Sequence, residues 1–273
     1  MDAPRIAFIG AGNMASSIIG GLVRSGHPVR DISVADPFAP SLLKLSAIAT
    51  VRVCDSNPAA VEGADVVVMA VKPQVMADAV SSIAPAVSAS GAVVMSIAAG
   101  ITIASMQKRL GEPAAIVRCM PNTPALLGCG ASALYANEHT SAQQRDYAQA
   151  VLSAVGVATW VEQESSLDAV TALSGSGPAY FFLFMEAMIA AGVDLGLEEK
   201  TASLLTLQTA LGAARMAGEN DAPLAELRRR VTSPGGTTQS AVENFQKNNL
   251  DTVVAQAMQA AAQRAAQMAE EMG

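Results

Sequence analysis

A glycine-rich turn directly after a short apolar run most limits how this 273-residue chain can fold. Arg5–Ile9 is predicted to be a strand, and Gly10-Ala11-Gly12-Asn13-Met14-Ala15 leads from it into an apolar helical stretch. This is G-x-G-x-x-A in a strand–turn–helix context. The first glycine permits the tight turn, the second lets the backbone approach a pyrophosphate, and the small third residue lets helix and strand pack closely. The alternative is a tight corner that binds nothing.

Short β-rich runs alternate with helical stretches through the N-terminal half. The predicted strands are Arg5–Ile9, Asp31–Ala35, Val66–Val71, Ala92–Ser96, Ala115–Cys119 and Ser132–Tyr135. Several are continuously apolar, as is typical of strands covered on both faces. The pattern predicts an α/β fold: an N-terminal Rossmann-type doubly wound, mainly parallel sheet that binds ligands at the carboxyl ends of its strands.

The composition changes after Trp160, and the Ala-, Leu- and Met-rich segments that follow predict helices only. We expect helices at about 177–195, 198–217, 222–231 and 236–271, the last broken near Asn248-Asn249. Acidic residues or proline in the first turn mark several of their starts. The chain is therefore predicted to form a dinucleotide-binding Rossmann domain at 1–160 and an all-helical domain at 161–273.

Charge and cysteine content exclude several classes of protein. The net charge is −7 without a Lys/Arg-rich block, which argues against nucleic acid as a partner. Cys54, Cys119 and Cys129 are odd in number and lack CxxC spacing, so a disulfide framework or structural zinc site is not expected and a cytoplasmic location fits. The longest apolar run, Pro178–Val193, contains Glu186 and is shorter than the roughly 20 residues of a membrane span. It predicts a buried helix.

Asp36 directly follows the second predicted strand and lies 21 residues beyond Ala15, the end of the glycine pattern. An acid there accepts hydrogen bonds from the adenosine ribose and favours NAD over NADP. It could instead be a turn aspartate before Pro37, and Arg30 and Lys44 could still oppose a 2′-phosphate. The choice of dinucleotide stays open.

Further loops follow other predicted strands, and their shared edge of the sheet makes them candidates. They are Ala70-Val71-Lys72-Pro73-Gln74, Ser96-Ile97-Ala98-Ala99-Gly100 and Cys119-Met120-Pro121-Asn122-Thr123-Pro124-Ala125. Lys72 could place a cation near phosphates, and the small residues of the second loop leave space for a flat ring. Asn122 and Thr123 could contact a ligand or only satisfy their turn.

The helical half carries two motifs of its own, Ser174-Gly175-Ser176-Gly177-Pro178 and Val231-Thr232-Ser233-Pro234-Gly235-Gly236-Thr237-Thr238. Free amides and hydroxyls in the second could bind a small carboxylate, or merely cap a helix. The only histidines are His27 and His139, outside these loops, and HExxH and nucleophile-elbow motifs are absent. Metal-dependent and serine-type hydrolysis are therefore not expected, and no metal site is predicted.

Taken in order, these motifs resemble the pyrroline-5-carboxylate reductase family over essentially the whole chain. The resemblance rests on the glycine pattern, the 70–73 loop, Ser96–Gly100, Arg118–Pro124, Leu173–Tyr180 and Val231–Thr238. It implies NADPH- or NADH-dependent reduction of 1-pyrroline-5-carboxylate to L-proline, the last step of proline biosynthesis. It also implies a C-terminal helical domain for dimerisation and substrate binding, with dimers that often assemble into a decamer.

The resemblance also implies which residues bind. Cofactor contacts would fall on Ile9, Gly10, Ala11, Gly12, Asn13, Met14, Ala35, Asp36, Asn57, Ala70, Val71, Lys72, Pro73, Ile97, Ala98 and Ala99. Substrate contacts would fall on Glu164, Ser233, Gly235, Gly236, Thr237 and Thr238. A protonated imine is already electrophilic, so we expect Thr238 to donate or relay a proton toward the ring nitrogen while proximity and the cofactor supply most of the catalysis.

Two other functions are weighed against this one. A related imine or β-hydroxyacid reductase on the same plan would be expected to carry a lysine on the first long helix after the Rossmann domain, and 177–197 contains none. A catalytically silent NAD(P)-sensing protein would keep the glycine loop but need not keep Thr238 or Glu164.

Overall fold

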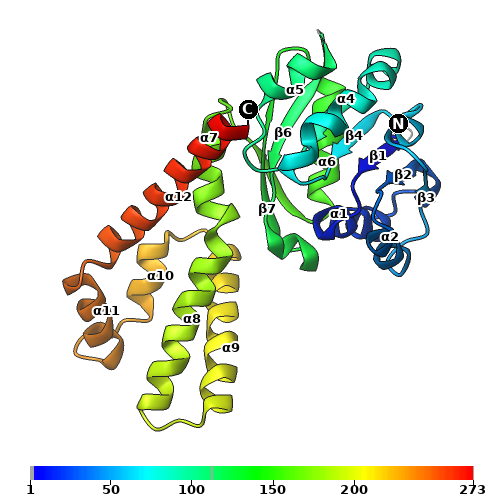
Figure 1. Ribbon diagram of the computed structural model, residues 1–273. Coiled ribbons are helices and arrows are strands. Elements are labelled where there is room, and N and C mark those ends of the chain that lie inside the picture. Colours follow the sequence, from blue (N-terminus) through cyan, green and yellow to red (C-terminus); the bar gives the residue numbers. More distant parts are fainter. Residues whose placement is uncertain (1–2, 112, 273) are drawn as a thin grey trace. The chain divides into compact units, whose positions relative to one another are not determined.

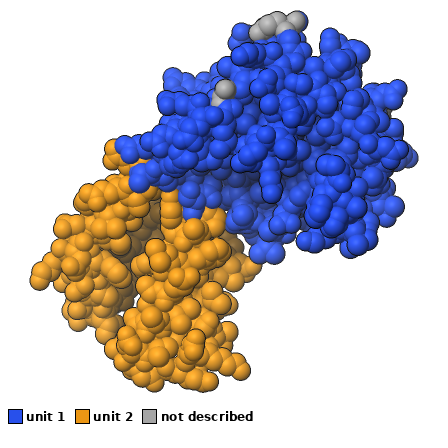
Figure 2. All heavy atoms as spheres, viewed as in Figure 1, with its two compact units in different colours: residues 1–176, 260–273 blue, residues 177–259 orange. Residues whose placement is uncertain are grey.

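The computed structural model describes residues 3–111 and 113–272, which form two compact units (Figure 1). Unit 1 contains residues 1–176 and 260–273, and unit 2 contains residues 177–259 (Figure 2). Each unit is described below by itself.

Unit 1 is organised around an eight-stranded sheet in the order β3-β2-β1-β4-β5-β6-β7-β8. The strands are β1 (Ile6–Ile9), β2 (Ile32–Ala35), β3 (Arg52–Val53), β4 (Val66–Met69), β5 (Val93–Ser96), β6 (Ile116–Met120), β7 (Gly130–Ala136) and β8 (Gly156–Trp160). All neighbours pair in parallel except β6 and β7. The predicted doubly wound, mainly parallel sheet is confirmed. The strand order reverses between β1 and β4, which places the switch point there.

Alternating side chains of the central strands enter two separate cores. Ile6 and Phe8 of β1 pack into one cluster, whereas Ala7 and Ile9 pack into the other. The residues of β4 divide in the same way. A strand with both faces covered therefore needs a continuous apolar run, which is what the sequence provides.

Helices supply the other half of both cores. They are α1 (Asn13–Arg24), α2 (Ala39–Ser46), α3 (Asn57–Val61), α4 (Pro73–Ser90), α5 (Ile103–Leu110), α6 (Ala142–Ser153) and α7 (Ser166–Val170). Short 3₁₀ turns lie at Val29–Asp31 and Thr123–Leu127, and a π-helical turn at Thr171–Gly175 follows α7. Residues of α1 and α6 belong to the first core, and residues of α4 and α5 to the second.

The strands β3 and β8 were not among those predicted. β3 has only two residues, both exposed, so it carries no hydrophobic pattern. β8 lies at the opposite edge of the sheet and contains no fully buried residue. Edge strands of this kind depend on hydrogen bonds to a neighbour, which composition does not reveal.

The helices of unit 2 match the predicted ones closely. They are α8 (Gly177–Asp194), α9 (Glu199–Gly218), α10 (Leu224–Arg230), α11 (Thr237–Lys247) and α12 (Leu250–Met272), whose last part belongs to unit 1. The predicted break near 248–249 is confirmed. Asn249 has a φ of 55°, in the left-handed region that ends a helix and that asparagine tolerates better than most residues.

The prediction that Pro178–Val193 forms a buried helix is wrong for the single chain. Phe181, Phe182 and Leu183 are 69%, 59% and 68% exposed. The reason is that apolar residues lie on all sides of α8, and its packing against α9 covers only part of this surface. Among the described residues, Ser166–Asp194 is one helical run whose length and composition would suffice to cross a membrane, with a mean hydropathy of 1.3.

Candidate active site

The turn after β1 requires glycine at its first position for two reasons. Gly10 has a φ of +100°, and a Cβ there would lie 2.7 Å from the carbonyl oxygen of Ala70 at the end of β4. Its amide donates to the Ala35 carbonyl of β2 at 2.8 Å. Gly10 therefore lets the chain cross closely over the ends of the two neighbouring strands.

Gly12 is different, because no contact with a described residue explains why this position is a glycine. Its φ of −65° suits any residue, and a Cβ built there would meet no described atom within 4 Å. Gly12 is the N-cap of α1 and offers no side chain to the first amides of that helix. Open space beside unused amides at the positive end of a helix fits a phosphate group.

Asp36 is fixed at the end of β2 by two backbone amides. Its Oδ2 accepts a hydrogen bond from the Ala11 amide and its Oδ1 one from the Phe38 amide, both at 2.7 Å. The carboxylate thus braces the glycine-rich turn while lining the same cavity as Gly12. This is the place where an acid reads the adenosine ribose in dinucleotide-binding domains.

A cavity of about 650 Å³ opens at the carboxyl ends of β1, β2 and β4. Its volume suits a sizeable small molecule. The predicted cofactor residues that line it are Ile9, Gly10, Gly12, Ala35, Asp36, Asn57, Ala70, Val71 and Lys72. The predicted residues Ala11, Asn13, Met14, Pro73, Ile97, Ala98 and Ala99 are not among its lining residues.

Seven further residues line this cavity and were missed from the sequence: Pro37, Phe38, Ser41, Val75, Asp78, Ala79 and Ser82. Pro37 and Phe38 follow Asp36 directly, and Ser41 lies in the first turn of α2. The last four recur at helical spacing, so they mark the face of α4 turned toward the cavity. That periodicity could have identified them once Lys72 was chosen. Asn57 is held here by a hydrogen bond from its Nδ2 to Ser82 Oγ at 3.1 Å.

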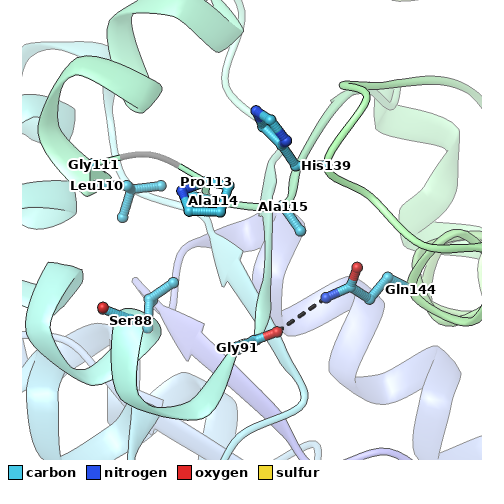
Figure 3. A pocket seen from close by; sticks show the side chains of 11 residues that line it. Ser88, Gly91, Leu110, Gly111, Pro113, Ala114, Ala115, His139 and Gln144 are labelled. Atoms are coloured by element: carbon cyan, nitrogen blue, oxygen red, sulfur yellow. Dashed lines mark hydrogen bonds between the residues drawn. The ribbon is translucent and has the colours of Figure 1, made fainter.

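A second cavity, of about 360 Å³, lies ahead of β5 and β6 (Figure 3). Ala92 and Ala115, which directly precede these strands, help to line it, and the Gln144 side chain reaches in to donate to the Gly91 carbonyl at 3.0 Å. It therefore sits at the amino ends of parallel strands, whereas doubly wound sheets bind ligands at the carboxyl ends. The larger cavity is the better candidate.

Asn122 serves the structure. Its Nδ2 donates to the Ser174 carbonyl at 2.9 Å, and its Oδ1 accepts from the Ala131 amide at 2.9 Å. The side chain is buried and ties the loop after β6 both to β7 and to the π-helical turn. Of the two interpretations of this residue, the structural one explains its contacts.

Glu164 lies in the segment between β8 and α7, where one of its oxygens is fully occupied. Oε1 accepts hydrogen bonds from the Ile103 amide at 2.9 Å and from Arg118 Nη1 at 3.0 Å. Arg118, on β6, is only 6% exposed, and its Nη2 lies 4.0 Å from Oδ1 of Asp168. Desolvation raises the pKa of Asp168, although Arg118 opposes this effect. Arg118 and Asp168 were not among the predicted site residues.

In unit 2, the remaining predicted substrate residues lie together at the start of α11. Gly235 has a φ of +72°, and Gly236 is the N-cap. The Gly236 amide donates to the Ser233 carbonyl at 3.0 Å, and the Gly235 amide donates to Gln239 Oε1 at 2.7 Å. The exposed Thr237 and Thr238 form the first turn. This segment, 233–238, presents the hydroxyls of Thr237 and Thr238 at the positive end of an 11-residue helix.

Positive charge near this segment is partly neutralised. Glu226 of α10 accepts hydrogen bonds from Arg229 at 2.7 Å and from Arg230 at 3.0 Å. These hydrogen bonds lower the pKa of Glu226 to about 2. Among the described residues, no group of three or more His, Cys, Asp or Glu side chains could hold a metal ion.

The fold and the cavity at the switch point define a class of protein. A doubly wound sheet with an open glycine turn, uncapped helix amides and an acid at the end of β2 is the architecture of a dinucleotide-dependent oxidoreductase. In agreement, residues 5–100 match the family described as "NADP oxidoreductase coenzyme F420-dependent".

Comparison over the full length gives the particular family. Residues 164–268 match "Pyrroline-5-carboxylate reductase dimerisation". The chain is 55% identical over 273 residues to pyrroline-5-carboxylate reductase of Pseudomonas aeruginosa, with 100% of both chains covered. This chain belongs to the pyrroline-5-carboxylate reductase family, as the resemblance of its motifs implied.

Solved structures agree with this assignment. A pyrroline-5-carboxylate reductase from Coxiella burnetii superposes with a TM-score of 0.95 and is 41% identical, with 97% of this chain and 98% of that chain covered. The Plasmodium falciparum pyrroline carboxylate reductase, solved with NADP bound, gives a TM-score of 0.85 at 29% identity, with 98% and 99% covered. The chain is an NAD(P)-dependent oxidoreductase with a dimerisation domain at 164–268.

Proposed function

We propose that this protein reduces 1-pyrroline-5-carboxylate to L-proline with NADPH or NADH, the last step of proline biosynthesis. The observation that carries the proposal is the cavity at the switch point, whose glycine turn and Asp36 suit a dinucleotide. Family membership over the whole chain supplies the substrate.

The reaction needs little chemistry from side chains. When bound, NADPH or NADH would supply the hydride for the imine carbon; with a proton added at the ring nitrogen, C=N would become CH–NH and the dinucleotide would be oxidised. The protein's task is to hold the imine carbon against the nicotinamide and to favour the protonated imine. Thr238 is proposed to donate or relay the proton.

The contacts of each ligand are part of the proposal. Dinucleotide contacts are assigned to Ile9, Gly10, Ala11, Gly12, Asn13, Met14, Ala35, Asp36, Asn57, Ala70, Val71, Lys72, Pro73, Ile97, Ala98 and Ala99. Substrate contacts are assigned to Glu164, Ser233, Gly235, Gly236, Thr237 and Thr238. Two facts support this division: nine of the first set line one cavity, and segment 233–238 begins a helix that can bind a carboxylate.

The division of labour along the chain follows from these assignments. Residues 1–160 are proposed to bind the dinucleotide, and residues 161–273 to dimerise and bind the substrate. The exposed apolar surface of α8 supports a homodimer formed through residues 161–273. From the family resemblance we further propose that these dimers assemble into a decamer. A cytoplasmic location is proposed from the absence of CxxC spacing and the odd number of cysteines.

An assay of substrate range tests the function. The purified protein is expected to oxidise NADPH or NADH with 1-pyrroline-5-carboxylate and, at high pH, to reduce the oxidised dinucleotide with L-proline. Other cyclic imines and β-hydroxyacids are expected to react at least 100-fold more slowly. Faster oxidation of a β-hydroxyacid would identify the related reductase, and dinucleotide binding without turnover would indicate a sensor.

A variant in the glycine turn connects this activity with the cavity. Gly12→Val puts a side chain into the open space in front of the α1 amides, and the backbone at Gly12 accepts it without strain. We expect at least a 100-fold loss of kcat/KM with an unchanged melting temperature. Full activity of this variant would contradict the placement of the pyrophosphate.

A further inference from the structure

The buried guanidinium of Arg118 belongs to a cluster that the cofactor cavity does not include. Arg118 Nη1 donates to Glu164 Oε1 at 3.0 Å, and Nη2 lies 4.0 Å from Asp168 Oδ1. That Asp168 atom is buried and has no hydrogen-bond partner among the described residues. A buried arginine needs charged partners, but this one makes its close contact with only one of the two carboxylates.

Glu164 is anchored asymmetrically by this contact. Oε1 accepts hydrogen bonds from Arg118 Nη1 and from the amide of Ile103, which lies in the first turn of α5. Oε2 accepts no hydrogen bond from any residue that the structure describes, and the side chain is 27% exposed. One oxygen is therefore held by two donors while the other stays available.

The cluster lies next to the loop whose residues Ile97, Ala98 and Ala99 are proposed to contact the dinucleotide. Ser96, the last residue of β5, pairs with Arg118 in the sheet. Ile103 begins the helix on the far side of the 97–102 loop. The Arg118–Glu164 pair thus lies beside this loop: the backbone of Arg118 is in register with Ser96 before the loop, and Glu164 accepts from the Ile103 amide after it.

We propose that Arg118 is a positioning residue for imine reduction, which orients Glu164 through Oε1 so that Oε2 offers negative charge to the protonated imine. This inference rests on the proposed function, because Glu164 is assigned there to the substrate. A fixed carboxylate favours the cationic imine, the form that accepts hydride. Arg118 itself contacts no substrate.

The planar fork of arginine is what the arrangement uses. Arg118 uses separate nitrogens for its two carboxylates: Nη1 lies 3.0 Å from Glu164 and Nη2 lies 4.0 Å from Asp168. A lysine ammonium cannot reproduce this geometry. Misplacing a substrate-holding group by about 1 Å costs on the order of 100-fold in rate. We therefore expect Arg118→Gln to lower kcat/KM for the imine about 100-fold and Arg118→Lys about 10-fold, mainly through KM for the imine, with KM for the dinucleotide within twofold.

A double-mutant cycle distinguishes positioning from general damage. If Arg118 acts through Glu164, adding Arg118→Gln to the Glu164→Gln variant lowers kcat/KM for the imine by less than about threefold, because the effects of coupled residues are not additive. Arg145→Gln is the matched control, since Arg145 lies over the Trp160 ring at 4.9 Å in the same unit. It is expected to keep kcat/KM within twofold.

The outcomes separate this inference from the function beneath it. Suppose that the wild type reduces the imine but that the losses of kcat/KM from Arg118→Gln and Glu164→Gln multiply in the double variant. That result would overturn the role of Arg118 and leave the function standing, as would equal rises in KM for imine and dinucleotide in Arg118→Gln. A wild-type protein that does not reduce the imine would overturn both. Should Arg118→Gln fail to fold, the same cycle with Arg118→Lys decides, with a loss of about 10-fold expected in the presence of Glu164 and almost none in its absence.

Discussion

At the scale of single residues, the two glycines of the turn after β1 have different reasons to be glycine, one in the fold and one in the proposed ligand. Gly10 is required by the protein, because its φ is positive and the Ala70 carbonyl at the end of β4 leaves no room for a Cβ. Gly12 is not required by anything in the described protein. A glycine that no contact within the protein requires indicates a ligand. The difference between Gly10 and Gly12 is therefore more specific evidence for a bound dinucleotide than the G-x-G-x-x-A pattern alone.

Asp36 gives a prediction about dinucleotide choice. Its carboxylate lines the cavity and is held there by the Ala11 and Phe38 amides, so it could not turn away from the 2′-phosphate of an NADPH bound as proposed. Two like charges about 4 Å apart at a protein surface repel by roughly 1–4 kcal/mol. Asp36→Asn is expected to raise the ratio of kcat/KM for NADPH to that for NADH by at least about 10-fold.

Steady-state kinetics with both dinucleotides check this prediction. Glu62→Gln is the control, since it removes a carboxylate outside the cavity and should leave the ratio unchanged. A ratio that stays constant in Asp36→Asn would show that Asp36 only braces the glycine turn.

At the scale of elements, the helix α8 shows what composition does and does not reveal. Its apolar composition predicts a buried helix, and this prediction is wrong for the single chain. Within one chain, Phe181 and Leu183 remain largely exposed, as do Leu204 and Leu205 of α9. An apolar surface of this extent is typical of a subunit interface. The match of this region to a dimerisation family agrees with that explanation.

Assembly through α8 can be tested by charge. Leu183→Glu places a carboxylate on the exposed apolar surface of α8, and burying it unpaired in an interface is strongly unfavourable. We expect the wild type to show a mass of at least two chains in light scattering at micromolar concentration, and Leu183→Glu to lose assembly. Leu43→Glu, at a similarly exposed leucine of α2 in unit 1, should assemble normally. A monomeric wild type would contradict the predicted homodimer.

At the scale of the whole molecule, the sequence predicts the fold more fully than the site. The six predicted strands are present, because continuous apolar runs and the glycine turn are local signals. The pairing of Arg118 with Glu164 was not predictable, since their contact joins β6 to a segment 46 positions later. Asn122 illustrates the same limit, because its partners Ser174 and Ala131 lie elsewhere in the chain.

We propose that the turn after β1 binds the pyrophosphate of the dinucleotide and that segment 233–238 binds the carboxylate of the imine. A crystal structure of the assembled protein with an oxidised dinucleotide and L-proline measures this most directly. We expect the pyrophosphate at Gly12 and the proline carboxylate on segment 233–238. The proline Cδ, which is the former imine carbon, is expected roughly 3–3.5 Å from the nicotinamide C4. Proline bound far from segment 233–238, or a pyrophosphate away from Gly12, would contradict it.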